Sequence, residues 1–116
     1  MQFDPQELHR SIDAICARRP RAVYLTHFGE VREVLRKADD LHRLVEAHAD
    51  IAAQAATLSD PLPALVDALR SLVLAEARRQ RCPLDEAALL ALFQDDIGLN
   101  ASGLLSYLER TRRTSA

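Results

Sequence analysis

The sequence predicts a mainly α-helical protein that contains one short β-strand. Hydrophobic residues make up 48% of the 116 residues, but only 4% are aromatic and only 3 residues are glycine. Such a composition favours helices over sheets. Apolar residues also recur at intervals of three and four along most of the chain, as in amphipathic helices. We therefore expect a single domain, 1–116, made of a helix, one strand at about residues 21–26 and a bundle of about four helices.

The first helix has start and stop signals in the stretch "FDPQELHRSIDAICARRP". Asp4 fits the N-cap position and Pro5 the first helical position, and Glu7 stands where a capping box requires an acidic residue. Pro20 should end the helix, because proline cannot continue the backbone hydrogen bonding. The apolar residues in between fall on one helical face: Leu8, Ile12, Ile15 and Cys16.

The next stretch, "AVYLT", is a continuous apolar run between Pro20 and Gly29 that is too short for a helix. It predicts a buried strand of the parallel type. A buried strand needs hydrogen-bonding partners on both sides for its backbone groups. We therefore expect its neighbours to come from another part of a larger protein or from a second copy of the chain.

The rest of the chain predicts helices. A long apolar stripe covers about residues 30–57, and a second stripe follows a Ser-Asp-Pro start signal near residue 60. The region from Cys82 onward predicts two short helices separated at "DDIGLN". In that segment Gly98 would be a C-terminal cap and Asn100 the next N-cap.

Charge and cysteine usage exclude several classes of protein. The 15 basic and 17 acidic residues are interspersed, which argues against a nucleic-acid partner. No apolar stretch approaches the roughly 20 residues of a membrane span, so we expect no membrane partner. The two cysteines lack the spacing of a zinc or redox motif, and no signal sequence is visible, so we expect a cytoplasmic protein. The cluster "ARRQR" is interpreted as cations at a helix C-terminus.

His27 is the candidate site residue that the pattern singles out. It follows the predicted strand directly, and ligands of α/β proteins gather at the carboxyl ends of strands. Gly29 would then let the backbone turn sharply. His48, in contrast, falls within the apolar stripe of the long helix and is interpreted as a packing residue. We assign no catalytic residue, because no serine or cysteine has a base or a glycine-rich turn nearby.

The remaining histidines receive no metal or catalytic role. Asp39, His42 and Glu46 form a polar ridge at intervals of three and four residues, and "DDLH" has the acidic-x-x-His spacing of di-iron helical bundles. Such a site needs a second copy of the motif and further carboxylates, so we interpret the ridge as a solvated helical face. His9 has only Asp13 one turn further on.

Two segments carry a family resemblance. "DPQELHRSIDAICARRPRAVYLTHFGEV" resembles the last helix and strand of metallo-β-lactamase-fold hydrolases, which end in a Thr-His-x-Gly turn. Residues 1–29 thus resemble the end of that core. Residues 30–116 resemble the helical extension of a bacterial branch of the family, notably in "EVREVLRKADDLHRLVEAHADIAAQ" and "FQDDIGLNASGLLSYLERTRR". The histidine of the turn is a metal ligand in this family, so the resemblance implies that His27 binds zinc in the complete protein.

The family's main ligand motif, His-x-His-x-Asp-His, is absent from this sequence. A catalytic zinc generally needs about three protein ligands. We therefore expect the chain to be the C-terminal domain of a metallo-β-lactamase-like hydrolase, inactive and without tightly bound zinc when alone, with the missing core as its partner. The alternative is a stand-alone helical module, without metal or enzymatic role, that forms a dimer through its apolar stripes.

Overall fold

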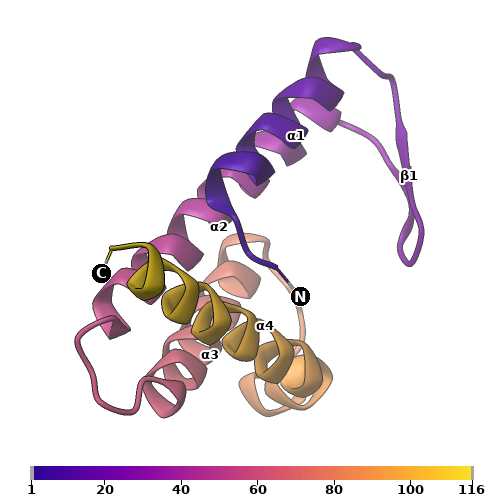
Figure 1. The fold of residues 1–116 in the computed structure, drawn as a ribbon. Coiled ribbons are helices and arrows are strands. Elements are labelled where there is room, and N and C mark those ends of the chain that lie inside the picture. Colours follow the sequence, from indigo (N-terminus) through magenta and orange to yellow (C-terminus); the bar gives the residue numbers. More distant parts are fainter. Residues whose placement is uncertain (1, 116) are drawn as a thin grey trace. The chain divides into compact units, whose positions relative to one another are not determined.

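The computed structural model describes residues 2–115 and is mainly helical (Figure 1). Its elements, in chain order, are α1 (Pro5–Ala17), β1 (Val23–Leu25), β2 (Gly29–Val31), α2 (Val34–Ala55), α3 (Leu62–Arg79) and α4 (Glu86–Ser115). The predicted fold class, a helix followed by a short strand and a helical bundle, is confirmed. The chain divides into two compact units: Asp4–Ala47 forms one, and Phe3 together with the chain from His48 onward forms the other.

Helix α1 begins and ends where the sequence predicts. Asp4 is its N-cap, and the Asp4 side chain accepts a hydrogen bond of 3.1 Å from the backbone N–H of Glu7. This bond satisfies one of the backbone donors that the first turn leaves free. At the other end Arg19 adopts a left-handed φ of 50°, and Pro20 follows. Both features prevent the helix from continuing.

The segment after α1 forms a β-hairpin, so the prediction of a buried strand of the parallel type without a partner in the chain is wrong. Strands β1 and β2 pair in antiparallel register, with Val23 opposite Val31 and Leu25 opposite Gly29. The backbone reverses because Gly29 has a φ of 80°, which glycine adopts without strain. A β-turn followed by a left-handed residue is a common hairpin connection.

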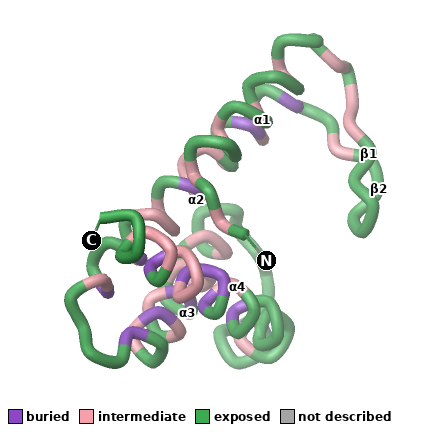
Figure 2. The backbone as a smooth tube through the Cα atoms, viewed as in Figure 1, coloured by how far each residue is buried: buried purple, intermediate pink, exposed green. Residues whose placement is uncertain are grey.

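The hairpin leaves large apolar side chains exposed. The exposed fraction is 77% for Tyr24, 46% for Leu25 and 84% for Phe28. Figure 2 shows most of the hairpin in the colour of exposed residues. Within "AVYLT", Tyr24 and Leu25 are therefore largely uncovered by the described part of this chain, whereas Ala22 and Val23 are half-buried.

The main hydrophobic core lies in the unit that begins at His48. Helices α3 and α4 pack together there, and the last turns of α2 add small side chains to the same cluster. Leu65 and Leu104 are almost completely buried. The buried residues of this core are Ala52, Ala55, Leu65, Leu69, Ile97, Ala101, Leu104 and Leu108.

Helix α4 is continuous from Glu86 to Ser115, so the predicted break at "DDIGLN" is wrong. Asp85 caps its start, accepting a hydrogen bond of 2.8 Å from the backbone N–H of Ala88. Gly98 costs a helix interior about 1 kcal/mol relative to alanine. Burial of the neighbouring Ile97 and Ala101 on one face offsets this cost, because the helix must continue to place both in the core.

Helix α3 ends in a Schellman motif. The backbone N–H of Cys82 donates to the carbonyl of Ala77 at 2.8 Å, and that of Arg81 donates to the carbonyl of Arg78 at 3.1 Å. These are the two bonds that define the motif. Arg81 occupies its left-handed position with a φ of 56°, where glycine is usual. Arg78 and Arg79 lie in the last turn, as expected for cations at a helix C-terminus.

Candidate functional site

His27 lies in the exposed turn of the β-hairpin, between β1 and β2. The turn is closed by a hydrogen bond of 3.3 Å from the backbone N–H of Phe28 to the carbonyl of Leu25. Among residues 2–115, no group of three or more histidine, cysteine, aspartate or glutamate side chains is arranged so that it could hold a metal ion. His27 is thus accessible to a partner, and its role as a metal ligand stays a prediction.

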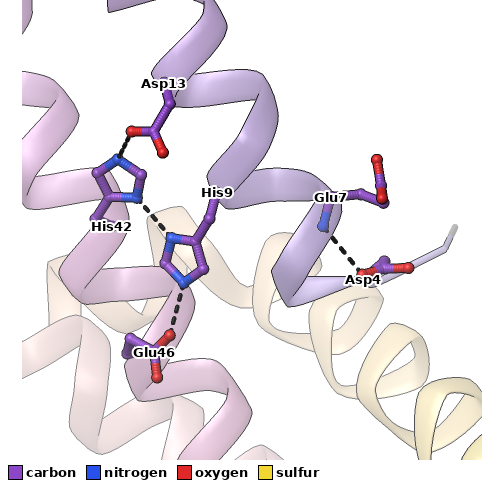
Figure 3. A network of polar contacts seen from close by, with 6 residues as sticks. All are labelled: Asp4, Glu7, His9, Asp13, His42 and Glu46. Carbon is purple, nitrogen blue, oxygen red and sulfur yellow. Dashed lines mark hydrogen bonds and ion pairs between the residues drawn. The ribbon is translucent and has the colours of Figure 1, made fainter.

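A cluster of two histidines and two carboxylates lies within the unit Asp4–Ala47 and joins α1 to α2 (Figure 3). The Nδ1 atoms of His9 and His42 are 2.5 Å apart. The Nε2 atom of His9 is 2.6 Å from Oε1 of Glu46, and the Nε2 atom of His42 is 2.9 Å from Oδ1 of Asp13. The four side chains form one unbranched series of contacts: Asp13, His42, His9, Glu46.

The positions of these four residues follow from helix geometry. His9 and Asp13 are one turn apart on α1, and His42 and Glu46 are one turn apart on α2, so each pair shares a helix face. The earlier residue of α1, His9, contacts the later residue of α2, Glu46, and the later residue of α1, Asp13, contacts the earlier residue of α2, His42. The two helices therefore run antiparallel here. Each histidine reaches the carboxylate of the opposite helix and not that of its own.

Sequence reasoning missed this cluster. His9 received no role, and His42 was placed on a solvated face, whereas both rings are half-buried and contact each other through their Nδ1 atoms. The solvated interpretation does hold for Asp39 and Glu46, which are exposed. The available signal was the repeated His-x-x-x-acidic spacing on two helices, although it does not show how the helices meet.

His48 is a packing residue, as predicted. It is half-buried, and its ring lies 6.3 Å from the ring of Phe3, measured between centroids. The ring of Phe3 also contacts Tyr107 of α4. The rings of Phe3 and Tyr107 pack against the hydrophobic core of this unit, and His48 lies beside Phe3.

No protein-family model matches the chain, and neither does any curated protein or solved structure. The resemblance to metallo-β-lactamase-fold hydrolases therefore rests on the two sequence segments quoted above. In residues 2–115, no helix combines the length and the apolar character that crossing a bilayer requires.

Proposed function

We propose that this chain is the C-terminal part of a metallo-β-lactamase-like zinc hydrolase, and that it docks on the catalytic core through its hairpin and contributes His27 as a metal ligand. The observation that carries the proposal is the hairpin itself. It places a histidine in an accessible turn beside three exposed apolar side chains: Tyr24, Leu25 and Phe28.

The hairpin suits docking on a sheet. Strand β1 pairs with β2 along one edge, and the backbone groups of its opposite edge remain available to another strand. Burying a large apolar side chain contributes about 1.5–3 kcal/mol, so covering Tyr24 and Phe28 would favour the complex. A sheet edge in the core is the occupant that satisfies both requirements.

One histidine does not make a zinc site. The described residues offer no group of three ligands, so the other ligands would have to come from the core. The chain alone is then inactive, and the activity belongs to the complex. A cytoplasmic location is part of this proposal, because Cys16 and Cys82 are both free, as in proteins of a reducing compartment.

Co-expression tests the proposal. The partner is a metallo-β-lactamase-fold core that carries the His-x-His-x-Asp-His motif and lacks its own closing helix and strand. We expect the two chains to co-purify with zinc, measured by mass spectrometry of the metal. His27→Ala should lower the zinc content and leave the complex intact, whereas Phe28→Ala should weaken the complex. The proposal is contradicted if the core does not bind the chain, or if His27→Ala leaves the zinc content unchanged.

Self-association is the second candidate, and a separate observation favours it. Leu92 and Leu99 are both exposed on α4, seven residues apart and hence on one helix face. This spacing is typical of a helix that packs against a second copy. Sedimentation velocity at micromolar concentration distinguishes the two: a dimer that becomes a monomer on Leu92→Glu, with no binding to the core, would favour the dimerisation module.

A further inference from the structure

The two histidine rings of the α1–α2 cluster meet edge to edge. Their centroids are 4.8 Å apart and their planes differ by 23°, while the two Nδ1 atoms are only 2.5 Å apart. The two nitrogens therefore lie between the rings, close to the line that joins the centroids (Figure 3). Two nitrogens this close are within hydrogen-bond reach, and an N–H···N bond requires one nitrogen to carry a proton and the other to have a free lone pair.

The carboxylates fix the remaining protons. Ionised Asp13 and Glu46 only accept hydrogen bonds, so the Nε2 atoms that face them, on His42 and His9, must both carry a proton. A neutral histidine has just one ring proton. If both rings are neutral, two lone pairs face each other across 2.5 Å, and if both are charged, two N–H groups face each other. All three hydrogen bonds form only when one ring is an imidazolium and the other is neutral.

We propose that His9 and His42 share a single proton and thereby form a pH-dependent clasp that holds α1 on α2. Closing the clasp takes up one proton. Rising pH removes this proton, leaves both rings neutral and so opens the clasp. Falling pH opens it when the second ring gains a proton, and further when Asp13 and Glu46 lose their charge. The contact between the helices is therefore strongest at an intermediate pH.

Other charged residues of the two helices also form ion pairs. On α1, Arg10 pairs with Glu7, and on α2, Arg43 pairs with Asp40. Asp39 lies one turn before His42 on α2 and is exposed. Asp13 and Glu46 contact the rings directly.

The clasp matters because α1 has few other contacts. The helix has no fully buried side chain, and its best covered apolar residues, Ile12 and Cys16, are half-buried. A helix with so little apolar burial belongs to the part of a protein that opens most easily. The hydrogen-bonded histidines thus add to the apolar contacts that keep α1 in place, and on the proposal their protonation controls its release.

Hydrogen exchange of the full chain measures this release. Exchange is followed by mass spectrometry from pH 5 to 9, because the ordinary pKa of histidine is about 6.5. Protection factors are corrected for the intrinsic pH dependence and compared between α1 and the core helix α4. We expect protection of α1 to reach a maximum within this range and to fall about tenfold on either side, as for loss of a charge-assisted hydrogen bond. Protection of α4 should not follow this profile.

Variants and a spectroscopic readout complete the test. His9→Gln and His42→Gln should each flatten the α1 profile, and the double variant should add little, while His48→Gln should keep the maximum. In the unmodified chain, ring-nitrogen NMR should show one proton shared between two Nδ1 atoms, which does not depend on how the variants fold. A flat profile, a maximum that survives both variants, or no shared proton would overturn the proposal. So would stoichiometric Zn²⁺ binding that displaces this proton, since the pair would then be a metal site.

Discussion

The ring of Phe3 meets the ring of Tyr107 edge to face, with centroids 5.3 Å apart and planes at 85°. Arg110, one turn further along α4, donates a hydrogen bond of 3.0 Å from its guanidinium to the backbone carbonyl of Phe3. The N-terminal Phe3 is thus held by the C-terminal helix within one compact unit. Edge-to-face aromatic pairs contribute about 0.5–1.5 kcal/mol beyond their buried area.

Replacing Phe3 should therefore destabilise the core that begins at His48. We expect Phe3→Ala to lower the free energy of unfolding by about 1–3 kcal/mol, because the aromatic pair and partial burial are both lost. Urea denaturation followed by circular dichroism gives the value. Phe28→Ala is the matched control, since Phe28 is exposed in the hairpin and should change the value by less than about 0.5 kcal/mol. Equal effects from the two variants would contradict the anchoring role.

Gly98 lies inside α4, and a Cβ atom added there would meet no other atom within 4 Å. Gly98→Ala should then raise the free energy of unfolding by about 0.5–1 kcal/mol, through helix propensity and a less flexible unfolded chain. Thermal unfolding provides the measurement. A loss of stability would indicate that the helix breaks at "DDIGLN" after all.

Arg81 adopts a left-handed backbone at the end of α3, which costs a residue with a Cβ atom about 1–2 kcal/mol. Arg81→Gly should relieve part of this cost and stabilise the protein by about 0.5–1 kcal/mol. Arg79→Gly, two residues earlier within the helix, should instead destabilise it by about 1 kcal/mol. Opposite signs in the two melting curves are the expected result.

The difference in burial between the core and the hairpin can be tested with one leucine from each. Leu65 is completely buried, so Leu65→Ala should cost about 2–5 kcal/mol. Leu25 is partly exposed on β1, and Leu25→Ala should cost less than about 1 kcal/mol in the isolated chain. If Leu25→Ala proves as damaging as Leu65→Ala, the strand is covered in solution, by a second copy or by another part of the protein.

The residue before α2 adds an acid-sensitive contact. A hydrogen bond and the charge of Arg36 lower the pKa of Glu33 below its ordinary value. A lowered pKa in the folded state means that the contact stabilises the protein above the ordinary pKa of 4.5 and loses this contribution as the pH falls through the lowered value. The melting temperature of Arg36→Gln should therefore equal that of the unmodified chain at low pH and fall below it at neutral pH. A difference independent of pH would exclude this linkage.

Local signals predicted the features of the fold that depend on adjacent residues. Asp4, Pro5 and Pro20 fix both ends of α1, because capping and the loss of the proline N–H act within a few residues. Gly98 and Asn100 gave equally clear signals for a break, yet the burial of Ile97 and Ala101 in the core prevails. Tertiary contacts of this kind override local preference and cannot be read from a short window.

The histidine cluster shows the same limit. Periodicity shows which residues share a helix face, and it grouped His42 with Glu46 correctly. It does not give the register of one helix against another, which is what brings His9 within 2.5 Å of His42. A sharp turn at Gly29 was predicted, but it was expected to lead into the next helix and not into a second strand that pairs with β1.

The open edge of β1 also affects how long the protein would persist in a cell. Chaperones and proteases act on exposed apolar strands, and unpaired edges promote aggregation. The hairpin displays Tyr24 and Phe28 beside such an edge. If the hairpin docks on a catalytic core as proposed, unbound copies should be degraded or aggregate sooner than bound ones, and the amount of this chain should follow the amount of that core.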